Sequence, residues 1–147
     1  MNAACQICER ETSEEEPLGG WVLRTEFWSA CVASGFEVPG WLFLELRRHA
    51  EGPMAMDGPE AGELGPLIVQ LTAGIERATQ AEKVYVLAFG ELFAHFHVLL
   101  LPRMPFSPPE LTGPSLFLQR EQLIDRDAAA EAAMRVCQSV SSQPDVE

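Results

Sequence analysis

A run of apolar residues that carries a histidine at its first and third positions constrains the fold of this chain most. The run reads His-Phe-His-Val-Leu-Leu-Leu-Pro-Arg over residues 95–103. It predicts a strand over 95–101. Side chains along a strand alternate between two faces, so His95 and His97 are expected on the same face. Two neighbouring imidazoles can divide their work, because one can hold a metal while the other attacks an electrophile.

Composition limits the class of protein. The chain has 147 residues, enough for one domain with a buried core. No apolar run reaches the ~18 residues of a membrane span, and the first 16 residues lack the apolar segment of a secretory signal. We therefore expect a cytoplasmic protein with reduced thiols and no membrane partner. The net charge of −12 argues against a nucleic-acid polymer as partner, but it permits a small anionic ligand.

The order of elements predicts the fold class. Strands are expected over 21–25, 28–32, 41–46, 84–89 and 95–101, with a surface connection over 9–20 and a proline-rich extended or looped segment over 102–114. A long helix is expected from about 58 to 80, because Asp57 and Pro59 suit its start and an apolar stripe follows at helical spacing. A short strand over 115–119 and a C-terminal helix over 127–140 complete the chain. This order predicts an α+β fold with a mostly antiparallel sheet.

Four cysteines occur in the sequence. Cys5 and Cys8 form a Cys-x-x-Cys pair, which suits redox chemistry, metal ligation or chance spacing. A redox pair of this type follows a strand and opens a helix, whereas this one precedes an acidic run at the N-terminus. Cys31 and Cys137 have apolar neighbours and are interpreted as core thiols.

The joint order of these motifs resembles the histidine-triad (HIT) superfamily of nucleotide hydrolases and transferases. That family carries His-φ-His-φ-His-φ-φ on a strand, where φ is apolar, often followed by Pro-Arg. His95, His97 and Arg103 match this pattern, while Leu99 stands where the third histidine belongs. The N-terminal Cys-x-x-Cys and Arg48-His49 resemble the zinc-bearing members, which include the galactose-phosphate uridylyltransferases.

This resemblance covers about residues 5–103. It implies one HIT-like domain over 1–147, in which 104–147 form a C-terminal extension that diverges from the family. It also implies a structural Zn²⁺ held by Cys5, Cys8, His49 and His95. Two thiolates and two imidazoles suit tetrahedral zinc, and a closed set of four ligands marks a structural site. The alternative to a zinc site is that Cys5 and Cys8 are an unstructured pair and that His49 is a surface residue.

The resemblance also implies roles for the residues that would meet a substrate. His97 would attack the α-phosphorus of a nucleotide and form a nucleotidyl-imidazole. Arg103 would help bind the phosphate, with Leu99 bordering the substrate in place of a proton carrier. Family members often have Gly-Gln-Ser/Thr upstream of the motif, where this chain has Gly-Glu-Leu over 90–92. Glu91 is a candidate acid, or else a solvated carboxylate.

Three functions follow as alternatives. The first is a HIT-like nucleotidyl hydrolase or transferase that cleaves a phosphoanhydride or phosphoramidate-type bond through a covalent nucleotidyl-histidine. The second is a catalytically impaired HIT-fold module that binds a nucleotide or another ligand, its chemistry lost with Leu92 and Leu99 in place of polar side chains. The third is a zinc-stabilised protein that acts only through partners. The first two predict a small-molecule nucleotide or nucleotide conjugate as partner, and the family implies a homodimer.

Overall fold

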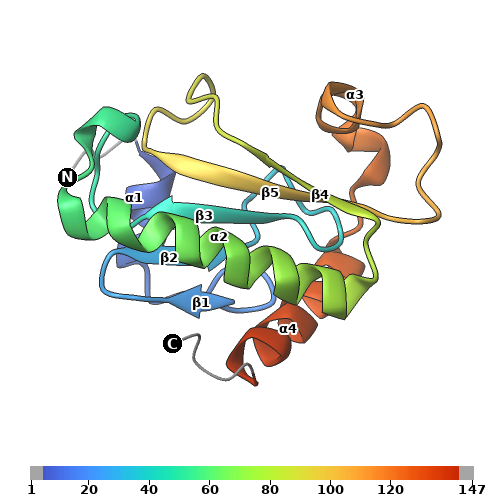
Figure 1. The fold of residues 1–147 in the computed structure, drawn as a ribbon, viewed down its shortest axis with the longest axis horizontal. Helices are drawn as coiled ribbons and strands as arrows, with labels where there is room; N and C mark the ends of the chain where they lie inside the picture. The colour runs from blue at the N-terminus through green and yellow to red at the C-terminus, as the bar shows by residue number, and fades with distance from the viewer. Residues whose placement is uncertain (1–4, 143–147) are drawn as a thin grey trace.

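A five-stranded antiparallel sheet lies at the centre of the molecule (Figure 1). The structure is a computed structural model that describes residues 5–142. The strand order is β1-β2-β3-β5-β4, so β3 and β5 pair in the middle of the sheet. The strands are β1 (Leu23–Arg24), β2 (Trp28–Cys31), β3 (Leu42–Leu46), β4 (Lys83–Leu87) and β5 (His97–Arg103). The predicted α+β fold with an antiparallel sheet is confirmed.

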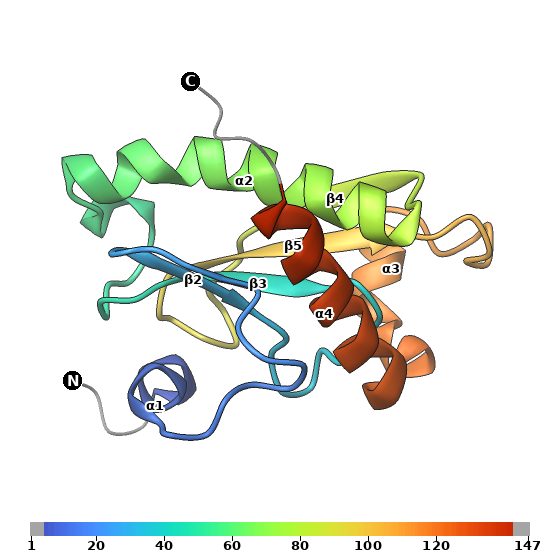
Figure 2. The same cartoon turned by 90° about the horizontal axis from the view of Figure 1, so that it is seen from below.

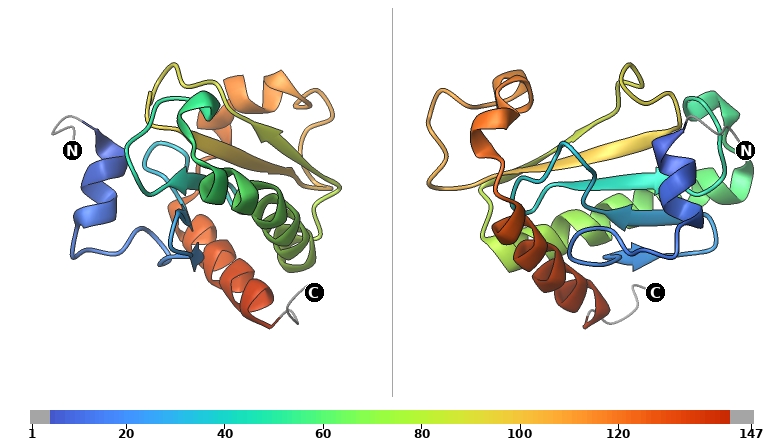
Figure 3. Two further views of the ribbon diagram at one scale, coloured as in Figure 1. Left: turned by 60° about the vertical axis from the view of Figure 1, so that its left-hand side comes forward. Right: turned by 180° about the vertical axis from the view of Figure 1, so that it is seen from behind.

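Four α-helices pack around this sheet. They are α1 (Gln6–Thr12), α2 (Gly58–Thr79), α3 (Pro114–Leu118) and α4 (Arg126–Ser141). Figure 2 shows α2 and α1 on opposite faces of the sheet, and α4 packs against α2. Seen from behind, α1 and α3 lie at opposite ends of the molecule (Figure 3, right). Among the described residues, no helix combines the length and apolar character that a membrane span requires.

The long helix begins and ends as its sequence indicates. Asp57 Oδ1 accepts a hydrogen bond from the Glu60 backbone N–H at 2.9 Å, and Glu60 Oε2 accepts one from the Asp57 N–H at 2.9 Å. This reciprocal capping satisfies two donors that a helix N-terminus otherwise leaves unpaired. Leu67, Leu71 and Ile75 bury the apolar stripe against the sheet. The helix predicted from about 58 to 80 is therefore confirmed.

Alternation along the strands separates two hydrophobic clusters. Leu44 and Leu100 face α2 and α4, where the cluster also includes Ala133, Val136 and Val140 of α4. Phe43 and Leu99 face the opposite side, in a second cluster that includes Leu111 and Leu116. Because His97 is two residues before Leu99 on β5, the imidazole of His97 belongs to this second face.

Three of the predictions about local structure are wrong. The last strand begins at His97 and continues to Arg103, while His95 makes only an isolated bridge to Glu51. Residues 115–119 do not form a strand, because Pro114 suits the first turn of a helix and the chain continues as α3. Residues 9–12 are not a surface connection, because they belong to α1, whose Ile7 and Cys8 are buried.

Candidate functional site

Four metal-ligating side chains meet between α1 and the sheet. Cys5 precedes α1 and Cys8 lies three residues on, so both thiols are on one side of its first turn. His49 follows β3 and His95 precedes β5; because these strands are antiparallel neighbours, the two histidines reach the same edge. The ligand atoms of all four residues lie within 4.8 Å of one another. The structure thus brings together the predicted metal ligands.

The spacing of these atoms fits a tetrahedral ion. Cys8 Sγ lies 3.3 Å from His49 Nδ1 and 3.5 Å from His95 Nδ1, and Cys5 Sγ lies 3.4 Å from His95 Nδ1. Zinc–sulfur bonds of about 2.3 Å and zinc–nitrogen bonds of about 2.0 Å separate neighbouring donors by roughly 3.5 Å. Burial lowers the pKa of His95, which favours the neutral imidazole that a metal requires.

The outer nitrogens of both histidines have partners as well. His95 Nε2 donates to the Leu46 carbonyl, and His49 Nε2 lies 3.5 Å from a carboxylate oxygen of Glu51. The hydrogen bond to Leu46 orients the His95 imidazole and leaves its Nδ1 free to face the ion. The Glu51 carboxylate lies on the outer side of the His49 ring.

His97 lies next to this cluster with a defined tautomer. Its Nδ1 donates to the His95 carbonyl at 2.8 Å, so Nδ1 holds the proton and Nε2 holds a lone pair. The ring stacks on Phe43 with centroids 4.7 Å apart and planes 14° apart, and Phe93 contacts it edge-on. Burial lowers the pKa of His97, which keeps the imidazole neutral and nucleophilic near pH 7.

His97 lines a pocket of about 830 Å³. Five of the eight phenylalanines of the chain line it, so its surface is largely aromatic and apolar. The predicted residues Leu99, Glu91 and Leu92 line it too, the last two exposed. The other lining residues are Phe36, Phe43, Tyr85, Val86, Leu87, Phe89, Gly90, Phe93, Gly113, Pro114, Phe117, Leu118 and Arg120.

Arg103 is not brought to this pocket. It ends β5 and lies 3.9 Å from a carboxylate oxygen of Glu82. Arg103 is six positions after His97 on β5, a separation of roughly 20 Å along the strand. The structure therefore does not place Arg103 beside His97, because β5 continues through Pro102 to Arg103. The cation that does line the pocket is Arg120, which no sequence motif singled out.

Comparison with known proteins identifies the fold. No family model matches the sequence, and no curated protein matches it. A solved structure of a hypothetical histidine triad nucleotide-binding protein from Sulfolobus tokodaii superposes with a TM-score of 0.73 at 17% identity, over 93% of this chain and 92% of that one. The chain has the histidine-triad fold.

Two further solved structures are similar to this chain. A zinc-bound histidine triad family protein from Mycobacterium smegmatis matches with a TM-score of 0.68 at 11% identity, over 95% of this chain and 96% of that chain. A structure described as a uridylyltransferase matches with a TM-score of 0.67 at 15% identity, over 96% of this chain and 46% of that chain. The resemblance inferred from the motifs is confirmed at the level of the fold.

A buried acid lies beside His97 in this histidine-triad fold. Glu45 on β3 pairs in register with His97 on β5 and forms an ion pair with Arg10 of α1. The Cys31 thiol donates to Glu45 Oε1 at 3.7 Å, while Glu45 Oε2 has no partner in the described part of the chain. Burial raises the pKa of Glu45 to about 7. The sequence signal for this residue is an acid within the apolar run over 41–46.

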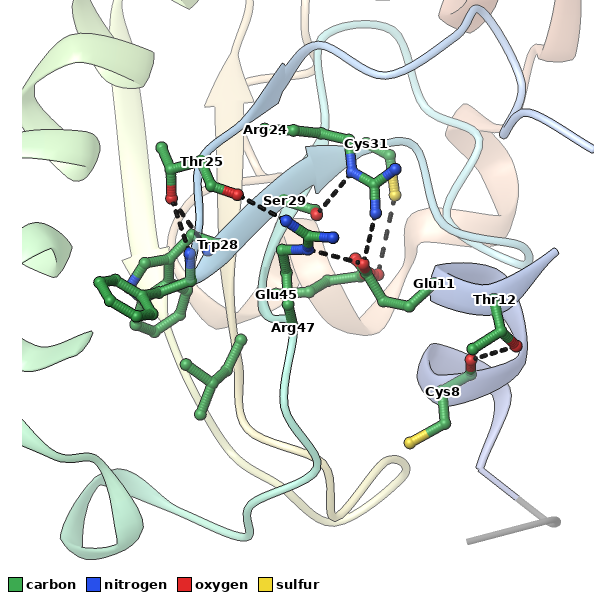
Figure 4. A network of polar contacts seen from close by, with 12 residues as sticks. Cys8, Glu11, Thr12, Arg24, Thr25, Trp28, Ser29, Cys31, Glu45 and Arg47 are labelled. Carbon is green, nitrogen blue, oxygen red and sulfur yellow. Dashed lines mark hydrogen bonds and ion pairs between the residues drawn. The ribbon is translucent and has the colours of Figure 1, made fainter. Parts of the chain in front are cut away.

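Helix α1 is also attached to the sheet through Glu11. Its Oε2 accepts hydrogen bonds from Arg24 Nη2 at 2.6 Å and from Arg47 Nε at 3.2 Å (Figure 4). Figure 4 shows these guanidinium groups converging on Glu11 beside Glu45. Ion pairs and the Cys/His cluster therefore connect α1 to the strands from two sides.

Glu45 makes the stability of the protein depend on pH. Because its pKa rises from 4.5 to about 7 on folding, the native state binds this proton more tightly than the unfolded state does. Its contribution to the free energy of unfolding is complete below about pH 4.5 and is lost as pH rises through 7. We expect wild type to lose on the order of 1–3 kcal/mol relative to Glu45→Gln between pH 5 and pH 8.

Urea unfolding of both proteins at pH 5, 6, 7 and 8 measures this difference. Titration of the Cys/His cluster is common to both proteins, so the comparison cancels it. Parallel stability curves for wild type and Glu45→Gln would show that Glu45 does not titrate in this range.

Proposed function

We propose that the protein is a HIT-like nucleotidyl hydrolase or transferase that acts through His97. The observation that carries the proposal is the combination of a neutral imidazole, a tautomer set by the His95 carbonyl, and a pocket beside the ring. A nucleophilic histidine needs all three, because its attacking nitrogen must hold a lone pair and face the substrate.

The proposed reaction has two steps. His97 Nε2 attacks the α-phosphorus of the substrate, a nitrogen–phosphorus bond forms, and the bond from phosphorus to the leaving group breaks. Water in a hydrolase, or an acceptor in a transferase, then cleaves the nitrogen–phosphorus bond. The His95 carbonyl stabilises the imidazolium character that develops on the ring during attack, because it accepts a hydrogen bond from Nδ1–H with an N···O distance of 2.8 Å.

The residues around His97 favour a particular kind of substrate. Leu99 and Leu92 offer no proton to a leaving group, and the loss of such help typically costs about 10²–10⁴-fold in rate. A phosphoanhydride or phosphoramidate-type bond needs less help than a simple ester. Glu91, exposed at the pocket, is the proposed proton donor. The names of two matched structures, a nucleotide-binding protein and a uridylyltransferase, support a nucleotide as substrate.

We further propose that Cys5, Cys8, His49 and His95 hold a structural zinc ion. Bound zinc would supply crosslinking between α1 and the sheet rather than chemistry, because four protein ligands leave no open position. His95 would then fix the start of β5, which carries His97 two residues on. The predicted homodimer and cytoplasmic location stay predictions.

A second function is favoured by the lining of the pocket. Its walls are almost entirely apolar, and Leu99 replaces the histidine expected two residues after the nucleophile. Such a pocket suits a module that binds a nucleotide or another small ligand without turning it over. The two functions share one site and differ only in whether a bond is broken.

Turnover decides between them. We would incubate the protein with dinucleoside polyphosphates, adenylyl amidates and nucleotide sugars, follow products by chromatography, and seek a nucleotidyl adduct by intact-protein mass spectrometry. Product formation together with an adduct on His97 supports the enzyme. Binding of a nucleoside monophosphate by calorimetry, with no product from any substrate, overturns the enzyme and supports the binding module.

A further inference from the structure

Arg120 is the one arginine or lysine among the residues that line the pocket. It begins a short 3₁₀ helix, Arg120–Leu123, directly after α3. Its guanidinium carbon lies 4.7 Å from the ring centroid of Phe36 and 4.8 Å from that of Phe117. Its Nη1 also donates to the Phe117 carbonyl at 3.1 Å. The two rings and the carbonyl hold this cation in position at the pocket wall.

No carboxylate pairs with Arg120 within residues 5–142. Seven of the other eight arginines form ion pairs with glutamate side chains: Arg10, Arg24, Arg47, Arg48, Arg103, Arg126 and Arg135. The sequence carries 22 acidic residues against 10 basic ones, so carboxylates are plentiful. Apart from the Nη1 bond to Phe117, the guanidinium makes no hydrogen bond to the described residues. Its Nε and Nη2 donors therefore remain available to a ligand.

A continuous row of rings joins Arg120 to His97. Phe36, which lies under Arg120, has its centroid 4.9 Å from that of Phe43, and Phe43 stacks on His97 at 4.7 Å. Phe36 and Phe43 are buried, so this row underlies the pocket, and the aromatic or apolar body of a ligand would occupy the pocket between its His97 end and its Arg120 end. One end of such a ligand would reach the imidazole, and the other end would reach the guanidinium.

We propose that Arg120 is the anion-binding, specificity-determining residue of this pocket. The ligand class is an organic anion with a flat aromatic or apolar body and a phosphate, carboxylate or sulfonate group at the Arg120 end. The inference rests on the proposed function only in that it assigns the ligand of the same pocket. In an acidic chain whose pocket walls are apolar, Arg120 supplies the attraction that draws an anion in.

A pair of probes that differ in one anionic group tests this. The probes are 1-anilinonaphthalene-8-sulfonate and its uncharged relative N-phenyl-1-naphthylamine, titrated by fluorescence into the full chain. We expect Arg120→Gln to weaken sulfonate binding about 10-fold or more, as a lost charge-assisted hydrogen bond would, with the neutral probe within about twofold. The matched control is Arg135→Gln, which makes the same change of net charge on the exposed side of α4 and should leave both probes unchanged.

The outcomes separate clearly. If Arg120→Gln weakens the binding of both probes equally, Arg120 only shapes the apolar wall. If Arg120→Gln and Arg135→Gln weaken sulfonate binding equally, only net charge matters. Either result overturns the proposal. Arg120→Lys guards against misfolding, because it keeps the charge and should retain part of the preference for the sulfonate. Near-ultraviolet circular dichroism verifies that each variant is native. Neither probe is a nucleotide, so failure of the proposed reaction leaves this test intact.

Discussion

Replacing Cys8 by alanine is expected to abolish zinc binding and to lower the melting temperature by about 10 °C or more. Cys8 is buried, and its sulfur lies within hydrogen-bonding distance of both His49 and His95, so its loss opens the ligand set at its centre. Without the metal, α1 keeps only its ion pairs and its short buried face as attachments to the sheet. Metal analysis of purified protein and thermal unfolding measure the two effects.

Cys137→Ala is the matched control, because that thiol is half-buried on α4 and lies outside the cluster. We expect it to keep about one zinc per chain and to change the melting temperature only slightly. Wild-type protein that contains no zinc when purified without chelator, or Cys8→Ala protein as stable as wild type, would contradict the proposed centre.

Replacing His97 by alanine is expected to lower kcat/KM for any accepted nucleotide substrate by at least about 10³-fold. The variant removes the nitrogen that forms the covalent bond, and in the described pocket no second histidine can replace it. The nucleotidyl adduct should disappear from the mass spectrum together with turnover. Steady-state kinetics and intact-protein mass spectrometry provide the two readouts.

Free imidazole separates a chemical role from a structural one. The alanine variant leaves space beside Phe43, where His97 now stacks, so added imidazole should restore part of the activity. A merely misfolded variant would not respond to imidazole. Full activity in His97→Ala protein would exclude the covalent route and direct attention to Glu91 or to a direct attack by water.

The elements that the sequence predicted well are those set by near neighbours in the chain. Asp57 and Glu60 are three residues apart, and their reciprocal cap starts α2 where the sequence indicated. The boundaries that failed, such as the start of β5 at His97, depend on which backbone groups find partners in another strand. Propensity within one segment does not report that pairing.

The metal ligands were predicted through resemblance rather than geometry. No local sequence pattern predicts that the residues around position 5 contact residues 49 and 95 in the folded protein. Arg120 shows the same limit more sharply, because its role depends on Phe36, which lies more than 80 residues earlier in the sequence. Arg103 is the opposite case. The Pro-Arg sequence after the histidines suggested a role at the substrate site, but Arg103 lies at the far end of β5, beside Glu82.

The sequence by itself determined that His97 and Leu99 share a face, that a capped amphipathic helix follows the third strand, and that cysteine and histidine pairs are available for a metal. Strand alternation, helix capping and residue chemistry act over a few residues, so they can be read along the chain. Only the tertiary structure decided that the cysteines meet the histidines, that Glu45 lies buried beside His97, and that Arg120 rather than Arg103 lines the pocket. These contacts join segments tens of residues apart, and packing of the whole core positions them.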